Sequence, residues 1–259
     1  MWAWRYQHVI VDETQDIGHE ALTLIRQLVP EGKNDLFLVG DGHQRIYRRR
    51  AVMSRAGINI RGRGKKLKIN YRTTEQIRRF AAAILDGQPI DDLDGEVDTS
   101  HDHRSLTRGP EPFLQHCDNE AAEIAWIVDK AKALTEGNEA GLAHCCLMLR
   151  TRKLRDRYAQ LLRDADVPVV VLEQGADNQA VPGIRVATLH RVKGLEFRNV
   201  FLASMSCNRM PNNYAVSGSE DKTEIREHEL AERALVHVAA TRAVENLMVS
   251  WFDERCEFF

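Results

Sequence analysis

Short apolar runs alternate with stretches of helical periodicity along most of this chain, which is the pattern of an α/β protein. Residues 8–12 and 35–41 have the composition of buried strands. Between these two runs the apolar residues recur on one helical face until Pro30, which cannot continue a helix. A second helix is predicted over residues 73–87, so the first third of the chain already shows two strands and two helices.

A polar interruption follows, and the alternation then resumes. Residues 86–112 are acidic and broken by Pro and Gly, so we expect a polar insertion there that forms a loop and is partly disordered. Another polar loop is expected over 206–226. The remaining helices are predicted over 120–134, 153–168 and 228–243, and the remaining strands over 144–151, 169–173 and 246–252, with two more within 183–204. This order predicts a doubly wound, mostly parallel sheet, in which residues 1–50 belong to a different unit from residues 51–259.

Composition narrows the class of protein. The chain has 259 residues, of which 43% are hydrophobic, enough for one large or two small packed domains. It has no run of about 18 apolar residues and no signal-peptide pattern at its start, so we expect no membrane partner. The five cysteines show no CxxC pairing, and we expect reduced thiols in a cytoplasmic protein rather than a metal site.

The charge is unevenly distributed along the chain. The net charge is −2, but residues 45–79 contain thirteen Lys or Arg and only one acidic residue. That segment therefore carries +12, and the rest of the chain carries −14. The segment is either a solvated basic loop or a surface that binds the phosphates of a nucleic acid, and charge alone leaves both open.

Carboxylates follow the first two predicted strands at the end where an α/β sheet usually places its chemistry. Asp12 and Glu13 come directly after the first strand, and Asp41 and Gln44 follow the second. One or two carboxylates together with substrate phosphates suit Mg²⁺, and an adjacent carboxylate can act as a general base. Two solvated acids after a strand are also common, so the pattern gains weight mainly because neighbouring strands share it.

Basic and polar residues mark further junctions between elements. Arg72 precedes a predicted helix start, where anions are favoured, and Arg242 lies between the last helix and the last strand. Seen alone, each is more often a surface arginine than a functional one. Four polar residues follow a buried strand and could converge on a ligand: Thr188, His190, Lys193 and Glu196.

Five segments, in this order, resemble the motifs of the UvrD/Rep-type superfamily 1 DNA helicases. They are "VIVDETQD", "VGDGHQRIY", "NYRT", "TLHRVKGLEF" and "ERALVHVAATRA". Each motif is weak or moderate alone, but the set is specific, and it spans nearly the whole chain. The resemblance implies a RecA-like fold with ATP between two RecA-like halves, and an enzyme that couples ATP hydrolysis to movement on single-stranded DNA and to unwinding.

The resemblance also implies the nucleotide roles of individual residues. Asp12 would hold Mg²⁺, and Glu13 would activate the attacking water. Gln44 would contact the γ-phosphate, which Arg72 and Arg242 would reach like arginine fingers. ATP and Mg²⁺ are therefore the expected cofactors.

Further residues are implied to contact the ribose and the nucleic acid. Glu196 would bind the ribose. The residues expected at single-stranded DNA are Tyr47, Arg49, Arg50, Thr188 and His190. Arg49 stands where the family usually has Trp, so one stacking platform is replaced by a side chain that can stack or bind phosphate. His237 and Ala234 likewise replace a usual Tyr and Arg.

The family's first half begins with a GxxxxGK[ST] phosphate loop, and no such segment occurs in these 259 residues. We therefore expect residues 1–50 to be the end of a first RecA-like half and residues 51–259 to be the second half. The chain alone would be inactive, and the missing half, on the same or a separate polypeptide, would be its partner. The alternative is a non-hydrolysing nucleic-acid-binding or regulatory module derived from such a helicase.

Overall fold

The computed structural model describes residues 6–46, 51–90, 103–173, 175 and 177–259, which divide into two compact units. The first unit comprises the described parts of residues 1–68 and 87–103, and the second comprises residues 69–86 and the described parts of 104–259. The first unit thus extends beyond the expected boundary near residue 50. The reason is packing, because Met53, Ala56 and Ile58 form a buried cluster with Leu22.

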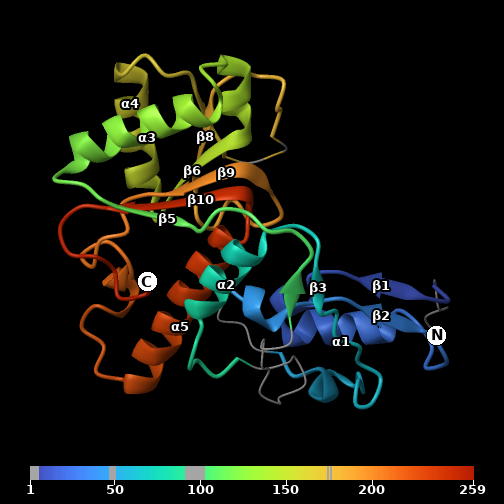
Figure 1. Ribbon diagram of the computed structural model, residues 1–259. Helices are drawn as coiled ribbons and strands as arrows, with labels where there is room; N and C mark the ends of the chain where they lie inside the picture. Colours follow the sequence, from blue (N-terminus) through green and yellow to red (C-terminus); the bar gives the residue numbers. More distant parts are fainter. Residues whose placement is uncertain (1–5, 47–50, 91–102, 174, 176) are drawn as a thin grey trace. The chain divides into compact units, whose positions relative to one another are not determined.

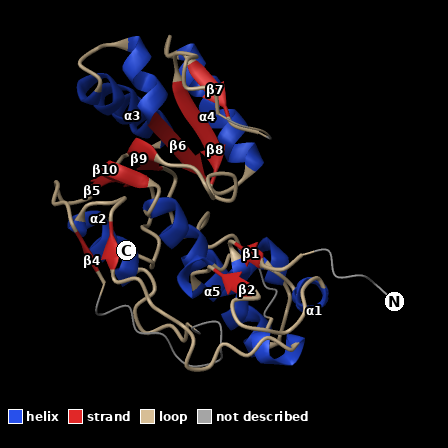
Figure 2. Cartoon of the chain, turned by 90° about the vertical axis from the view of Figure 1, so that its right-hand side faces the viewer, coloured by secondary structure: helices blue, strands red, loops and turns tan. Residues whose placement is uncertain are grey.

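The first unit is built on a pair of parallel strands and one helix. Strand β1 (Val9–Val11) pairs with β2 (Leu36–Leu38), and helix α1 (His19–Gln27) connects them. Figure 2 shows α1 beside this strand pair. Short 3-10 helices follow the two strands, at Thr14–Asp16 and Gly42–Gln44, and a third, at Met53–Ala56, lies within the basic segment 45–79.

The second unit contains a sheet of six strands, and every pairing in it is parallel. The strands in spatial order are β5 (Phe113–His116), β10 (Ala243–Trp251), β9 (Phe197–Leu202), β6 (Cys145–Leu149), β8 (Ile184–Thr188) and β7 (Val169–Val171). The central strand β6 is buried along its whole length, as its unbroken apolar sequence predicts for a strand covered on both faces.

Helices cover both faces of this sheet (Figure 1). Helices α3 (Glu120–Leu134) and α4 (Arg152–Asp164) lie on one face, and α2 (Glu75–Ala83) and α5 (Lys222–Ala240) lie on the other. The main apolar core lies between α3, α4 and the central strands. The predicted α/β fold with a doubly wound parallel sheet is therefore confirmed.

Two elements lie in segments that the sequence led us to expect as loops. Strand β4 (Arg104–Ser105) lies inside the expected 86–112 loop and pairs with β3 (Ile69–Asn70). Residues 91–102 of that expected loop lie outside the described residues. Helix α5 begins at Lys222, not at residue 228, because Asp221 caps the backbone N–H groups of its first turn. That first turn is polar, so it lacks the apolar periodicity on which the prediction relied.

All five cysteines are free thiols, and four of them are buried. Burial raises the pKa of Cys145 and of Cys256 to about 11, so both remain protonated at neutral pH. None of the helices in the described part of the chain is long and apolar enough to span a bilayer.

Candidate functional site

The acidic residues of the first unit lie just beyond β1. Asp12 and Glu13 are both exposed, and Asp12 Oδ1 accepts a hydrogen bond from the Glu13 backbone N–H at 2.8 Å. Glu13 has a φ of 52°, a left-handed backbone that a residue other than glycine rarely adopts. Such a conformation is held by its surroundings and often occurs at functional positions.

Buried Gln15 joins these acids to the end of the neighbouring strand. Its Nε2 donates to Glu13 Oε2, and its Oε1 accepts from the Asp41 backbone N–H at 3.0 Å. Asp41 in turn accepts from Gln44 Nε2 at 2.9 Å. The parallel pairing of β1 and β2 therefore brings Glu13, Asp41 and Gln44 into one network. No role was predicted for Gln15 from the sequence, although its position within the acidic motif is the signal that could have found it.

The oxygen atoms at this edge of the first unit are suited to a magnesium ion. Mg²⁺ is usually held by one or two carboxylates together with phosphate oxygens and water. The exposed Asp12 carboxylate provides such a donor, with Glu13 adjacent in sequence. No group of three or more His, Cys, Asp or Glu side chains arranged for metal binding occurs among the residues the structure describes. Phosphate oxygens and water would supply the rest of the coordination of a magnesium ion held at Asp12.

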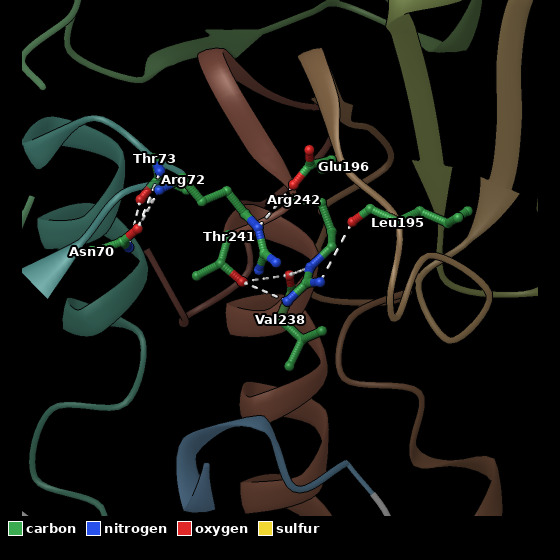
Figure 3. Close-up of polar contacts among 8 residues, drawn as sticks. All are labelled: Asn70, Arg72, Thr73, Leu195, Glu196, Val238, Thr241 and Arg242. Carbon is green, nitrogen blue, oxygen red and sulfur yellow. Dashed lines mark hydrogen bonds and ion pairs between the residues drawn. The ribbon is translucent and has the colours of Figure 1, made fainter. Parts of the chain in front are cut away.

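In the second unit, the side chain of Asn70 fixes the backbone turn that carries Arg72. Asn70 Oδ1 accepts hydrogen bonds from the backbone N–H groups of Arg72, at 2.8 Å, and of Thr73, at 3.2 Å (Figure 3). The turn directs the Arg72 side chain to Glu196, with Nε donating to Oε2 at 3.0 Å. Both side chains stay accessible, at 45% and 62% of their surface.

Arg242 lies beside this pair but is almost completely buried. Its guanidinium donates to the carbonyl oxygens of Val238, at 3.1 Å, and Leu195, at 3.4 Å. Its own carbonyl accepts from the Phe197 backbone N–H at 2.9 Å, which fixes Arg242 next to Glu196. Figure 3 shows Arg72, Glu196 and Arg242 gathered in one place, two guanidinium groups and one carboxylate.

Two of the residues expected at single-stranded DNA, Thr188 and His190, lie elsewhere in the second unit. Thr188 ends β8, and His190 follows it as an exposed residue. Because the strands are parallel, the end of β8 lies at the carboxyl end of the sheet, and the starts of β9 and β10 lie at its amino end. Thr188 and His190 are therefore separated from Glu196 and Arg242, and the segment 189–196 runs from the carboxyl end of the sheet to its amino end. The expected residues Tyr47, Arg49 and Arg50 lie outside the described part of the chain.

His190 sits in a charged environment. Desolvation of the imidazole lowers its pKa, the Arg150 guanidinium lowers it further, and the Glu232 carboxylate opposes both. The imidazole is therefore neutral at physiological pH, and it can donate one hydrogen bond and accept another.

Residues 61–68 of the basic segment and one aromatic ring are open to solvent. Every residue from Arg61 to Lys68 is exposed. In the second unit, Tyr71 is 73% exposed and immediately precedes Arg72. An exposed tyrosine ring offers a surface on which a base can stack, and no role was predicted for Tyr71 from the sequence.

Comparison with solved structures supports the fold of the second unit. The C-terminal domain of a possible DNA helicase from Lactobacillus plantarum WCFS1 matches with a TM-score of 0.51 and 16% sequence identity. The match covers 73% of this chain and 91% of that domain. At this identity the likeness concerns the fold alone.

Sequence comparison identifies helicases among the relatives. A probable DNA helicase of Mycoplasma pneumoniae is 25% identical over 248 residues, which cover 93% of this chain and 43% of that protein. The ATP-dependent DNA helicase UvrD1 of Mycobacterium tuberculosis H37Rv is 29% identical over 182 residues, 65% of this chain and 22% of that protein. The chain thus spans less than half the length of these relatives.

Two family models match almost the whole chain. The model of the UvrD/REP helicase N-terminal domain matches residues 1–55, and that of the UvrD-like helicase C-terminal domain matches residues 65–176 and 173–254. These matches contain all the motifs identified in the sequence, and they agree with the RecA-like parallel sheet of the second unit. The chain therefore belongs to the UvrD/REP helicase family.

Proposed function

We propose that this chain is the C-terminal part of an ATP-dependent DNA helicase or translocase, which couples ATP hydrolysis to movement on single-stranded DNA and to duplex unwinding. The observation that carries the proposal is the cluster of Arg72, Glu196 and Arg242. Two guanidinium groups, that of Arg72 held by Glu196 and that of Arg242 held by backbone carbonyls, suit the charge that develops on a phosphoryl group during transfer. In this proposal both arginines contact the γ-phosphate and Glu196 binds the ribose.

The acidic edge of the first unit would supply the hydrolytic chemistry. Asp12 would hold Mg²⁺, which when bound neutralises charge on the phosphate oxygens. Glu13 would accept a proton from the attacking water, and its hydrogen bond from Gln15 orients the carboxylate. Gln44, anchored to Asp41, would contact the γ-phosphate.

Nucleic acid would bind through the basic segment and the end of β8. Clustered, exposed Arg and Lys side chains displace counterions from a phosphate backbone. We assign base and backbone contacts to Thr188 and His190, and also to Tyr47, Arg49 and Arg50. Tyr71 would stack on a base of the nucleotide or of the nucleic acid.

The β1–β2 pair bears apolar side chains that need a covering. Ile10 and Phe37, paired in register, are 76% and 63% exposed. We propose that the rest of the first RecA-like half, on the same or a separate polypeptide, covers this face and provides the phosphate loop. The 259 residues alone would then show negligible ATP turnover. Five free thiols fit a reducing compartment such as the cytoplasm.

The test is ATP turnover with and without single-stranded DNA, for the chain alone and for the chain joined to a first half that carries a phosphate loop. We expect turnover only in the joined form, and we expect Arg72→Ala to reduce it about 10³-fold. The matched control is Arg198→Ala, which removes another exposed, ion-paired arginine of the same unit. Joined protein that binds DNA but hydrolyses no ATP would support the non-hydrolysing module. Rapid turnover by the chain alone would contradict the assignment of the phosphate loop to another segment.

A further inference from the structure

Glu232 is a buried carboxylate on α5 at which three separate segments meet. Its side chain is 5% exposed and accepts two hydrogen bonds from Arg150, at 2.7 Å from Nε and 2.5 Å from Nη2. It also accepts the backbone N–H of Asn212 at 3.0 Å. The bidentate geometry fixes the orientation of both charged groups.

Arg150 brings this contact to the start of the segment 189–196. It directly follows β6, whose last residue, Leu149, is paired in register with Thr188 at the end of β8. The Leu189 backbone N–H donates to the Leu149 carbonyl at 2.9 Å. Arg150 and Leu189 are therefore the next residues beyond these two adjacent strands, and His190 directly follows Leu189. The buried ion pair thus lies at the segment where nucleic acid is proposed to bind.

The same segment is tied to α5 at its other end. Arg242 donates from Nη1 to the Leu195 carbonyl, and its own carbonyl accepts from the Phe197 N–H. Arg242 lies ten positions after Glu232, and most of these positions belong to α5. Ten helical residues span about 15 Å along the helix axis. Helix α5 and the segment 189–196 thus both run between the carboxyl and amino ends of the sheet, and contacts link the helix to the segment at both ends.

A buried ion pair is weak evidence for stabilisation, because removing two charges from water costs about as much as their attraction returns. Apolar residues of similar volume could pack α5 against β6 equally well. Apolar residues, however, would place no charged groups of fixed orientation next to His190, as the hydrogen-bonded pair of Arg150 and Glu232 does. Geometry therefore favours a positioning role over a purely stabilising one.

We propose that Arg150 and Glu232 are positioning residues that hold the Thr188–His190 segment to α5, so that nucleic acid bound at that segment determines the placement of Arg242 for hydrolysis. This inference rests on the proposed function. DNA bound at the carboxyl end of the sheet would in this way affect the nucleotide site at its amino end.

The first experiment needs only the 259-residue chain. The His190 imidazole is titrated by NMR, with its signal identified by its loss in His190→Gln. Arg150→Gln removes the cation and leaves the carboxylate, so the pKa of His190 should rise. Glu232→Gln leaves the cation, so the pKa should fall. Shifts in the same direction, or no shift in either variant, would overturn the proposed placement.

The second experiment uses the joined protein that hydrolyses ATP. Each of the two variants should lower the ratio of turnover with single-stranded DNA to turnover without it by about tenfold or more. The control is Tyr158→Phe, which removes the buried hydrogen bond to Glu123 between α3 and α4 on the opposite face. That variant should lower the Tm and leave the ratio unchanged.

The outcomes separate the two proposals. A constant ratio with a lowered Tm in Arg150→Gln and Glu232→Gln would show that the pair only stabilises the fold. A wild-type joined protein without ATP turnover would refute the proposed function, and the titration would still decide whether Arg150 and Glu232 lie beside His190.

Discussion

Arg72 donates a hydrogen bond from Nε to Glu196 Oε2 at 3.0 Å, although 124 residues separate them in the sequence. Both side chains remain largely accessible, so the pair is a surface ion pair, and such pairs contribute little to stability. Each partner can therefore exchange the other for a ligand at small cost. In the proposed function, the arginine that would reach a phosphate and the carboxylate that would bind a ribose are thus kept oriented but available.

Glu196→Gln tests this reading of the pair. We expect the free energy of unfolding to change by less than about 1 kcal/mol, because solvent screens the lost attraction. Nucleotide affinity of the joined protein should fall, because the charged acceptor for the ribose is gone. Urea unfolding and nucleotide titration measure the two quantities. Glu245→Gln, which breaks the exposed Arg198–Glu245 pair, is the control and should leave nucleotide affinity unchanged.

Glu13→Gln tests the proposed general base. The substitution keeps the shape of the side chain and removes its ability to accept a proton from water. Turnover of the joined protein should fall by about 10²–10⁴-fold, while nucleotide binding is retained. Single-turnover hydrolysis and equilibrium binding separate the two effects, and an unchanged rate would exclude Glu13 as the base.

The salt dependence of single-stranded DNA binding tests the basic segment. Arg61→Gln with Lys65→Gln removes two exposed cations. If both contact phosphates, the slope of log affinity against log salt should become shallower by about 1.4, since each contact contributes about 0.7 on a single strand. The control is Lys153→Gln with Arg163→Gln, an equal charge change on exposed positions of α4. Equal slopes in wild type and both variants would show that the segment is only solvated.

Glu75 makes the second unit sensitive to acid. The hydrogen bonds from Arg78 lower the pKa of Glu75 from 4.5 to about 2, against the opposing effect of burial, and the Ser105 N–H contributes further. A pKa lowered in the folded state means that the ionised carboxylate stabilises the fold. This contribution is complete above about pH 4.5 and is lost as the pH falls toward 2.

The measurement is the free energy of unfolding of wild type and Glu75→Gln between pH 6 and pH 2.5. The difference between the two proteins should shrink by about 2–3 kcal/mol over this range. Above pH 5 it should be constant. A difference that is independent of pH throughout would mean that Glu75 titrates normally in the folded protein.

Local sequence predicted the elements that have a strong local signal. The apolar run over Cys145–Leu149 forms the buried central strand, and the acids after β1 and β2 meet at one edge because parallel strands end together. The polar first turn of α5 and the two-residue strands β3 and β4 gave no such signal. These elements are fixed by a cap and by a pairing between distant residues.

The site was predictable to a similar degree. The motif residues were found, but the contacts between them were not. Arg72 meets Glu196 only because of how the strands are ordered, and Glu232 lies 82 positions after Arg150. No pattern of period two or 3.6 relates residues so far apart, so only the folded chain shows which charges are partners.

The strand order also bears on how the protein is made. Edge strand β5 is the first of the six strands to leave the ribosome, and its neighbour in the sheet, β10, is the last. The backbone of β5 therefore cannot form its ladder until nearly the whole chain has been synthesised. Pairing between such distant segments is slow, because loop closure must occur before the contact is gained. The nascent chain would expose an unpaired, partly apolar strand throughout that time, and shielding by a chaperone should raise the yield of folded protein.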